Sequence, residues 1–196
     1  MGHLVARDVV LTRGDVTLRP LRRGDEREWL ALREENRSWL RPWEAITPPG
    51  RPASSASFPA YVWRERRRWK DDAAFACVIV VDGVLVGRMS IHAIEWGAQC
   101  GASIGYWIAA SHAGRGIVPT AVAMLSEYAF ERGVHRLEIA MRPENDASLR
   151  VAQKLGFRAE GVRERYIYID GGWRDHVIFA LTAEEPRQGP FWGPSF

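Results

Sequence analysis

The feature that most constrains the fold is a strand-like run, a glycine-containing loop and an amphipathic helix in direct succession. The apolar run Cys100–Ala110 has the length of a strand, the loop His112–Ile117 holds two glycines, and Val118–Gly133 shows helical periodicity and ends at a glycine. The first N–H groups of a helix have no partner within it and point outward. The succession therefore predicts an α/β domain and makes the loop a candidate anion site.

The segment before this unit predicts one strand, two helices and a β-hairpin. The strand is Val16–Arg22, the helices are Gly24–Leu40 with a cap at Asp25 and Ala60–Asp72, and the hairpin is Ala73–Trp96 around Asp82-Gly83. The residues between the helices, Arg41–Pro59, are rich in Pro and Ser and predict a loop.

The segment after this unit adds a strand, a helix and a second hairpin. They are Val134–Pro143, Glu144–Phe157 and Arg158–Leu181. The whole order predicts an α/β fold with a mixed central sheet of about seven strands and flanking helices. We expect a single domain over residues 1–182 and an irregular tail, residues 183–196, which contains Phe191 and Trp192.

Composition narrows the class of protein. The 196 residues contain two cysteines, Cys77 and Cys100, and no apolar run near the roughly 20 residues that span a bilayer. No secretory signal is evident, so we expect a reduced, cytoplasmic protein without membrane attachment. The five histidines show no ligand spacing, so we expect no metal. The net charge of +3 is compatible with a ribosome or a phosphate-rich cofactor, while the basic stretch Arg64–Lys70 is more typical of a solvated face than of a DNA-binding patch.

The loop His112–Ile117 lacks both the Walker pattern and the three-glycine dinucleotide pattern. On its own it is either a helix-initiating turn or a phosphate cradle. A second signal lies in Glu144–Phe157, where Asn145 or Asp146 can cap a helix and Ser148 falls in the first turn with its hydroxyl free to face a ligand.

Together the two segments resemble the acyl-CoA site of the GCN5-related N-acetyltransferases (GNAT). The strand "ASIGYWIAA", the loop Ser111–Gly116 and the helix with Asn145, Ser148 and Gly156-Phe157 carry the resemblance, which spans Val16 to Leu181. The segments "ENRSWLRPWEA", "GYWI", "LGFRAEG" and "IDGGWRDHV" are similar to the RimJ/RimL branch, on its RimJ side. This branch acetylates the N-terminal residue of ribosomal proteins.

The resemblance implies a GNAT fold with a V-shaped splay between strands 4 and 5, and acetyl-CoA as cosubstrate. The implied cofactor-binding residues are Tyr106, Trp107, Ile108, Ala109, His112, Ala113, Gly114, Arg115, Gly116, Ile117, Asn145 and Ser148. Backbone N–H groups from Tyr106 to Ala109 would stabilise the oxyanion. Ser111 stands where the superfamily loop has Gln or Arg, which removes one side-chain contact to phosphate.

Three catalytic candidates follow. The resemblance to the RimJ/RimL branch implies that Ser148 protonates the leaving thiolate. Ala152 occupies the position of the tyrosine that many GNAT members use, and this branch also lacks that tyrosine. The fourth strand lacks the glutamate base of many members, so Glu44 and Glu160 are candidate bases. The alternatives are a loop-ordering contact for Glu44 and a structural hydrogen bond for Glu160.

The acceptor pocket is expected to involve Asn36, Trp39, Trp43, Tyr106 and Asp175. The alternatives are core packing for the tryptophans and a hairpin bond for Asp175. The predicted function is acetyl transfer from acetyl-CoA to the N-terminal α-amine of a ribosomal protein, by direct attack in a ternary complex. A polyamine or aminoglycoside acetyltransferase and a CoA-binding ribosome-assembly factor remain alternatives. Ribosome association and either a monomer or a homodimer are compatible with the sequence.

Overall fold

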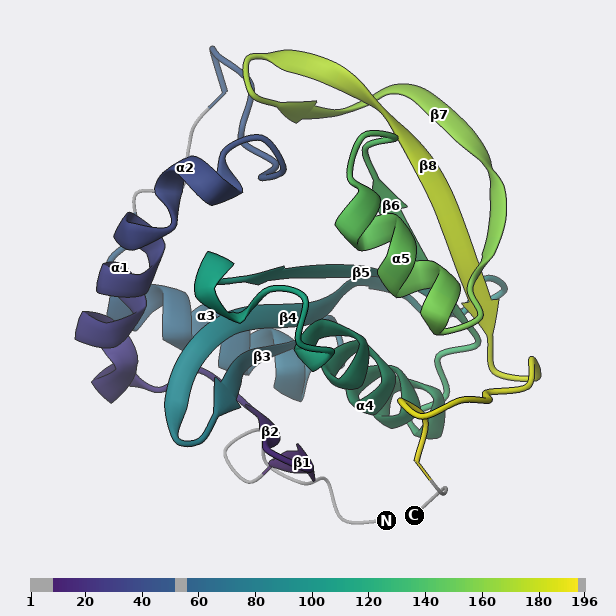
Figure 1. Cartoon of the computed structure of the whole chain (residues 1–196), viewed down its shortest axis with the longest axis horizontal. Coiled ribbons are helices and arrows are strands. Elements are labelled where there is room, and N and C mark those ends of the chain that lie inside the picture. Colours follow the sequence, from purple (N-terminus) through teal and green to yellow (C-terminus); the bar gives the residue numbers. More distant parts are fainter. Residues whose placement is uncertain (1–8, 52–55, 194–196) are drawn as a thin grey trace.

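An eight-stranded mixed sheet forms the centre of the protein (Figure 1). The structure is a computed structural model and describes residues 9–51 and 56–193. The strands follow the order β1-β2-β3-β4-β5-β6-β8-β7, and β5 and β6 are the parallel pair. Their bounds are β1 (Leu11–Arg13), β2 (Val16–Arg19), β3 (Phe75–Val81), β4 (Val84–Glu95), β5 (Gly101–Ile108), β6 (Arg136–Met141), β7 (Arg158–Ile169) and β8 (Gly172–Thr182).

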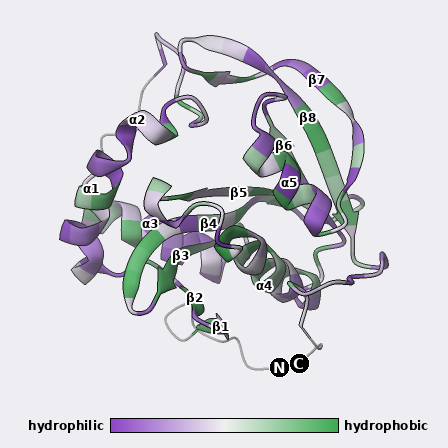
Figure 2. Ribbon diagram, in the orientation of Figure 1, coloured by the Kyte–Doolittle hydropathy of each residue, from purple (hydrophilic) through white to green (hydrophobic). Residues whose placement is uncertain are grey.

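Helices cover both faces of the sheet because its central strands are apolar on both sides. All seven residues of β3 are buried, as expected for a strand between two packed layers. One face packs against α4 (Ile117–Glu131) and α5 (Asp146–Lys154), and the other against α1 (Glu26–Glu35) and α3 (Phe58–Lys70). The short helix α2 (Arg37–Leu40) follows α1. In Figure 2 hydrophobic residues gather in the β3–β4 hairpin and β8, whereas α1 is largely hydrophilic.

The predicted mixed α/β class is confirmed, but the sheet has one strand more than the seven expected. The extra strand, β1, has three residues and pairs with β2 across a turn at Gly14, where φ is +59°. A three-residue strand contains too short an alternation to be separated from a loop in the sequence.

The predicted helix Gly24–Leu40 is two helices. Asn36 has φ −103° and ψ 12°, and it separates α1 from α2. Asp25 is the N-cap residue of α1, as predicted, but its side chain makes no capping hydrogen bond to the helix. Its carboxylate accepts hydrogen bonds from the Arg22 N–H and the Arg19 guanidinium instead of from the helix, because a 3₁₀ turn precedes α1.

The tail is irregular in its described part but is packed against the domain. Residues 183–193 form no helix or strand. Trp192 is nevertheless only 9% exposed, and Phe191 packs against the main core. Arg13 donates to the Phe191 carbonyl and pairs with Glu127 of α4 at 2.7 Å. These contacts fix the tail beside α4 and β1.

Candidate active site

The candidate site is built where β5 and β6 part. The two strands pair in parallel from Gly101 and Arg136 as far as Ile104 and Ile139, and β5 then continues to Ile108. The predicted V-shaped splay is thus present, and it lies between β5 and β6 because β1 adds one strand to the count (Figure 1). Such an opening leaves the polar backbone groups of β5 available to a ligand.

Strand geometry decides which of these backbone groups face the opening. The Ala109 N–H donates to the Val86 carbonyl at 2.8 Å, so it points toward β4. Successive residues of a strand direct their N–H groups to opposite sides. The Trp107 N–H therefore also points toward β4, while the N–H groups of Tyr106 and Ile108 point into the splay. The expectation that the Ala109 N–H serves as an oxyanion donor is wrong, and Tyr106 and Ile108 are the donors that the geometry supports.

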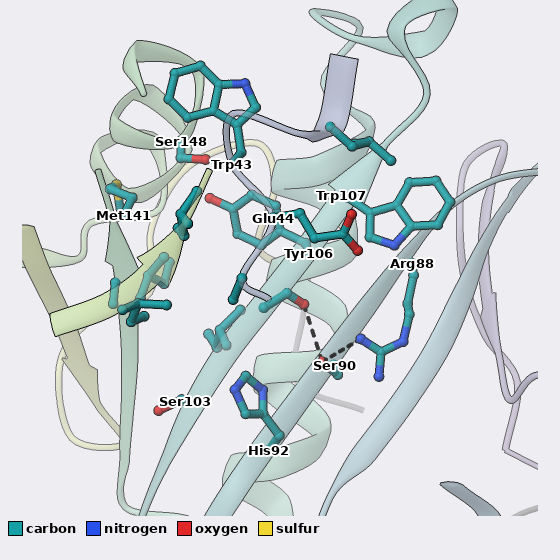
Figure 3. A pocket seen from close by; sticks show the side chains of 18 of the residues that line it. Trp43, Glu44, Arg88, Ser90, His92, Ser103, Tyr106, Trp107, Met141 and Ser148 are labelled. Atoms are coloured by element: carbon teal, nitrogen blue, oxygen red, sulfur yellow. Dashed lines mark hydrogen bonds between the residues drawn. The ribbon is translucent and has the colours of Figure 1, made fainter. Parts of the chain in front are cut away.

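A cavity of about 600 Å³ opens beside the splay. Six of the predicted site residues line it: Trp43, Glu44, Tyr106, Trp107, Asn145 and Ser148. In Figure 3 Ser148 and the Tyr106 hydroxyl lie at one end, and Ser90, His92 and Ser103 lie at the other. The structure thus brings cofactor-side and acceptor-side candidates from distant parts of the chain into one cavity.

Ser148 is positioned by the cap of α5. The Ser148 N–H donates to Asn145 Oδ1 at 3.1 Å, which confirms Asn145 as the cap. The Ser148 side chain lies beside the Tyr106 hydroxyl (Figure 3). Burial raises the pKa of Tyr106 to about 12, although the neighbouring Ser148 hydroxyl lowers it somewhat. Tyr106 therefore keeps its proton at neutral pH.

The predicted anion cradle lies between β5 and α4. Gly114 and Gly116 have φ of +78° and +80°, and Gly116 is the residue that caps α4. A Cβ at Gly114 would meet nothing within 4 Å, so the loop is open on that side. The first turn of α4 carries no acidic side chain, so the partial positive charge of the helix N-terminus is not neutralised. The loop fits a pyrophosphate group, and Arg115 is exposed beside it.

Glu44 faces the cavity and also orders its loop. Its carboxylate pairs with Arg33 at 2.5 Å, and the Arg33 guanidinium lies 5.3 Å from the centre of the Trp107 ring. The neighbouring Trp43 ring lies 5.5 Å from the Arg142 guanidinium. Both interpretations of Glu44, a base and a loop-ordering contact, are compatible with this position.

Glu160 and Asp175 do not line the cavity. Glu160 pairs with Arg136 and Arg158, whose charges hold the pKa of this carboxyl at about 2. The Asp175 carboxylate accepts a hydrogen bond from the Arg165 N–H at 2.7 Å across the last hairpin. The structure therefore favours the structural alternative for both residues over the predicted catalytic and substrate-binding roles.

Asn36 and Trp39 are also placed differently from the expectation. The buried Asn36 amide donates to the Leu32 carbonyl at 2.9 Å and accepts from the Ala110 N–H at 2.8 Å. Trp39 is 42% exposed, and its Nε1 donates to the Ile108 carbonyl at 3.0 Å. Neither residue lines the cavity. Both fix the end of β5 to the first helices, so they position the splay and do not contact an acceptor from this cavity.

The polar end of the cavity was not predicted from the sequence. It is formed by Arg88, Ser90 and His92 of β4 and by Ser103 of β5. Arg88 pairs with the buried Glu65 at 3.2 Å. His92 Nδ1 is buried without a hydrogen bond of ordinary geometry, and burial, followed by the charge of Arg88, lowers the pKa of this imidazole. The available signal was the alternation Arg-x-Ser-x-His, which places three polar side chains on one face of a strand.

The described residues hold no group of three or more His, Cys, Asp or Glu side chains that could bind a metal ion. None of the helices in residues 9–51 and 56–193 is both long enough and apolar enough to cross a membrane.

The comparison with protein families decides the membership of the chain. Residues 15–158 match the acetyltransferase (GNAT) domain. The chain belongs to the GNAT acetyltransferase family. The β5–β6 splay and the glycine loop before α4 both lie within the residues that match this domain.

Relatives within the GNAT family include proteins that act on ribosomal proteins. The chain is 32% identical to "Probable N-acetyltransferase YjcK" of Bacillus subtilis, over 88% of this chain and 97% of the relative. It is 29% identical to the ribosomal protein uS5-alanine N-acetyltransferase of Escherichia coli, over 82% of this chain and 80% of that protein. Mycobacterium smegmatis RimJ, solved in complex with CoA-disulfide, superposes with a TM-score of 0.81 and 38% identity, covering 88% of this chain and 84% of RimJ.

Proposed function

We propose that this GNAT enzyme transfers an acetyl group from acetyl-CoA to the N-terminal α-amine of a ribosomal protein. The observation that carries the proposal is the splay itself. The glycine loop and the N-terminus of α4 beside it suit an acyl-CoA. The 600 Å³ cavity, which is lined by Asn145 and Ser148 of the α5 N-terminus, suits the reacting groups and an acceptor. The named activity of the E. coli relative supports the choice of acceptor, and the complex of RimJ with CoA-disulfide supports the choice of CoA.

Different groups of the chain would bind different parts of acetyl-CoA. The loop His112–Ile117 offers backbone N–H groups to the pyrophosphate, and the side chain of Ile117 is buried, so only its backbone takes part. The N–H groups of Tyr106 and Ile108 point into the splay, where they would stabilise the oxygen of the reacting carbonyl. Ser148, held by Asn145, faces the place where the sulfur would leave.

An α-amine needs little help to become a nucleophile. Its pKa of about 7.7–8.0 leaves on the order of a tenth of the molecules neutral at pH 7, against a few in ten thousand for lysine near 10.4. The neutral nitrogen attacks the carbonyl carbon, the C–S bond breaks, and the amine loses a proton. We assign the removal of that proton to Glu44, the carboxylate that lines the cavity.

The cavity charge argues against a polyamine or an aminoglycoside as acceptor. Four arginines line the cavity, Arg33, Arg68, Arg88 and Arg142, whereas Glu44 is its one acidic residue among those described. A polycationic acceptor would meet like charges here, and repulsion of this kind disfavours binding. A peptide N-terminus brings a single ammonium group and carbonyls that can accept hydrogen bonds from arginine.

The experiment is acetylation of defined peptides. A peptide with a free N-terminus and an internal lysine is incubated with the enzyme and acetyl-CoA, and fragmentation mass spectrometry locates the acetyl group. We expect it on the α-amine, and acetylation of lysine or of spermidine in a parallel reaction would contradict the proposal. Intact-mass analysis of ribosomal proteins from cells with and without the gene then identifies the acceptor. Ribosome co-sedimentation without any acetyl transfer would favour the assembly-factor alternative.

A further inference from the structure

The phenol of Tyr106 is an unpaired buried group at the reaction site. Its hydroxyl is buried and makes no hydrogen bond of ordinary geometry among the described residues. Most buried hydroxyls in folded proteins have a partner, because an unpaired one costs free energy. A buried, unpaired hydroxyl that lines the cavity of an enzyme therefore points to a role in the reaction.

The surroundings of this hydroxyl identify the role. Tyr106 projects from β5 across the splay, and its oxygen lies close to the Ser148 hydroxyl on α5 (Figure 3). The part of the cavity lining that β6 contributes includes the apolar residues Ile139 and Met141. Tyr106 and Ser148 thus line the same end of the cavity (Figure 3), and the proposed function assigns Ser148 to the leaving sulfur.

We propose that Tyr106 and Ser148 form a two-hydroxyl relay that carries the proton lost by the amine to the leaving thiolate. The inference rests on the proposed function, and it adds a catalytic use of the Tyr106 side chain to the use of its backbone. A hydroxyl group both donates and accepts a hydrogen bond, so a pair of hydroxyls can pass a proton without either one holding a charge.

The transfer balances. The N–C bond forms and the C–S bond breaks, which leaves a proton in excess on nitrogen and an electron pair on sulfur. Glu44 takes the proton that the nitrogen releases and passes it to Tyr106, while Tyr106 gives its own proton to Ser148 and Ser148 gives its proton to sulfur. Both hydroxyls end as they began, and the products are the amide and the free thiol. The high pKa of Tyr106 fits this role, because the phenol stays protonated at the start of each cycle.

The test uses Tyr106→Phe, Ser148→Ala and the double variant. Each single variant should lower kcat by on the order of tenfold to a hundredfold, as for other proton-transfer groups. Because the two groups act as one unit, the double variant should be no slower than the slower single variant. A kcat loss in the double variant that equals the product of the two single losses would overturn the relay. Wild-type kcat in Tyr106→Phe would also overturn it. The Kd for CoA should stay within about twofold in Tyr106→Phe, because the backbone groups of β5 remain.

Tyr128→Phe is the control. Tyr128 is a partly buried phenol of α4 that accepts a hydrogen bond from Trp69 Nε1 at 3.2 Å, and it does not line the cavity. We expect its loss to leave kcat within about twofold, as for substitutions away from the reacting groups. An equal loss of kcat in Tyr128→Phe would show that the loss of any buried phenol lowers kcat through packing, which would contradict a specific relay.

A second measurement does not depend on turnover. In the free enzyme, NMR of labelled tyrosine should show that Ser148→Ala shifts the ring resonances of Tyr106 and leaves those of Tyr61 unchanged. Tyr106 resonances that do not respond to Ser148→Ala would contradict the contact. If no peptide is acetylated but Tyr106 responds in this way, the proposed acceptor fails and the hydroxyl pair stands, so the two failures are distinguishable.

Discussion

Glu44 and Glu160 show how the surroundings of a carboxylate decide its role. Both are candidate bases by residue type, but Glu160 lies outside the cavity between Arg136 and Arg158, which hold its pKa at about 2. A carboxylate stabilised in its charged form to this degree is a weak proton acceptor. Glu44 makes a single ion pair, to Arg33, and lines the cavity.

We therefore predict opposite outcomes for the two isosteric amides. Glu44→Gln should lower kcat on the N-terminal peptide by on the order of tenfold to a hundredfold, because the proton acceptor is lost. Glu160→Gln should keep kcat within about twofold and change stability by no more than about 1 kcal/mol, as for other solvent-exposed ion pairs. Steady-state kinetics and urea denaturation provide both quantities. Equal losses of kcat in the two variants would contradict the assignment of Glu44.

At the scale of single residues, the sequence predicted the contacts that are made within one segment. Asn145 and Ser148 were identified because capping depends on residues three positions apart, and the structure confirms that bond. The roles of Asn36, Asp175 and Glu160 depend on Ala110, Arg165 and Arg136, which other segments bring to them. No spacing rule within one segment contains that information, so their hydrogen bonds could not be predicted.

At the scale of elements, the glycine loop and α4 form the unit that should bind the pyrophosphate. Gly116 has φ +80° at the start of α4, and Gly133 has φ +94° just after its end. An alanine at either position is strained by about 1–2 kcal/mol, because its Cβ disfavours the left-handed region. The contacts that the new Cβ would make are ordinary ones, 3.5 Å from Phe191 and 3.8 Å from Trp96.

The two positions therefore separate strain from ligand binding. We predict that Gly116→Ala weakens CoA binding by on the order of tenfold, because the strained residue displaces the N–H groups of the loop, and tenfold corresponds to about 1.4 kcal/mol. Gly133→Ala should lose comparable stability with an unchanged Kd. Isothermal calorimetry with CoA and urea denaturation measure the two effects. A Kd that changes equally in both variants would show that general destabilisation, and not the loop, controls binding.

The order of the elements was predictable because long periodic segments, glycine ends and the Asp82-Gly83 turn are signals carried within each segment. The exceptions are short or depend on partners. β1 is held by its pairing with β2, and the tail is held by Arg13 and Glu127. The splay was expected from resemblance alone, because the point at which β5 and β6 stop pairing is a property of the sheet and not of either strand.

At the scale of the whole molecule, two imidazoles bias the pH dependence of stability. Burial lowers the pKa of His92 and of His176 below the usual value of 6.5. His92 faces Arg88, Arg68 and Glu65. The His176 Nδ1 donates to the Arg174 carbonyl, and Arg142, Asp175 and Glu144 are nearby. Because the carbonyl only accepts, the His176 Nδ1 carries the proton in this bond.

The direction of the pH dependence of stability follows from proton uptake by the two imidazoles. Below pH 6.5 both imidazoles bind protons in the unfolded chain, whereas in the folded state they stay neutral to lower pH. The free energy of unfolding therefore falls as the pH drops below 6.5. Above pH 6.5 the stabilisation is fully present. The slope is at most about 1.4 kcal/mol per pH unit for each imidazole. The carboxylates with lowered pKa, such as Glu160, begin to contribute only near their unfolded value of 4.5, so the range from pH 7.5 to 5.5 isolates the histidines.

We predict that urea denaturation will show a stability loss between pH 7.5 and 5.5 that is roughly halved in His92→Gln, because that variant retains one of the two buried imidazoles. His135→Gln is the matched control: its imidazole is exposed, pairs with Glu184 at the surface and does not line the cavity, so the wild-type slope should remain. A wild-type stability that is flat or rises as the pH falls over this range would show that the two imidazoles accept protons in the folded state. That result would contradict the burial that makes His92 and His176 neutral groups in the lining of the cavity.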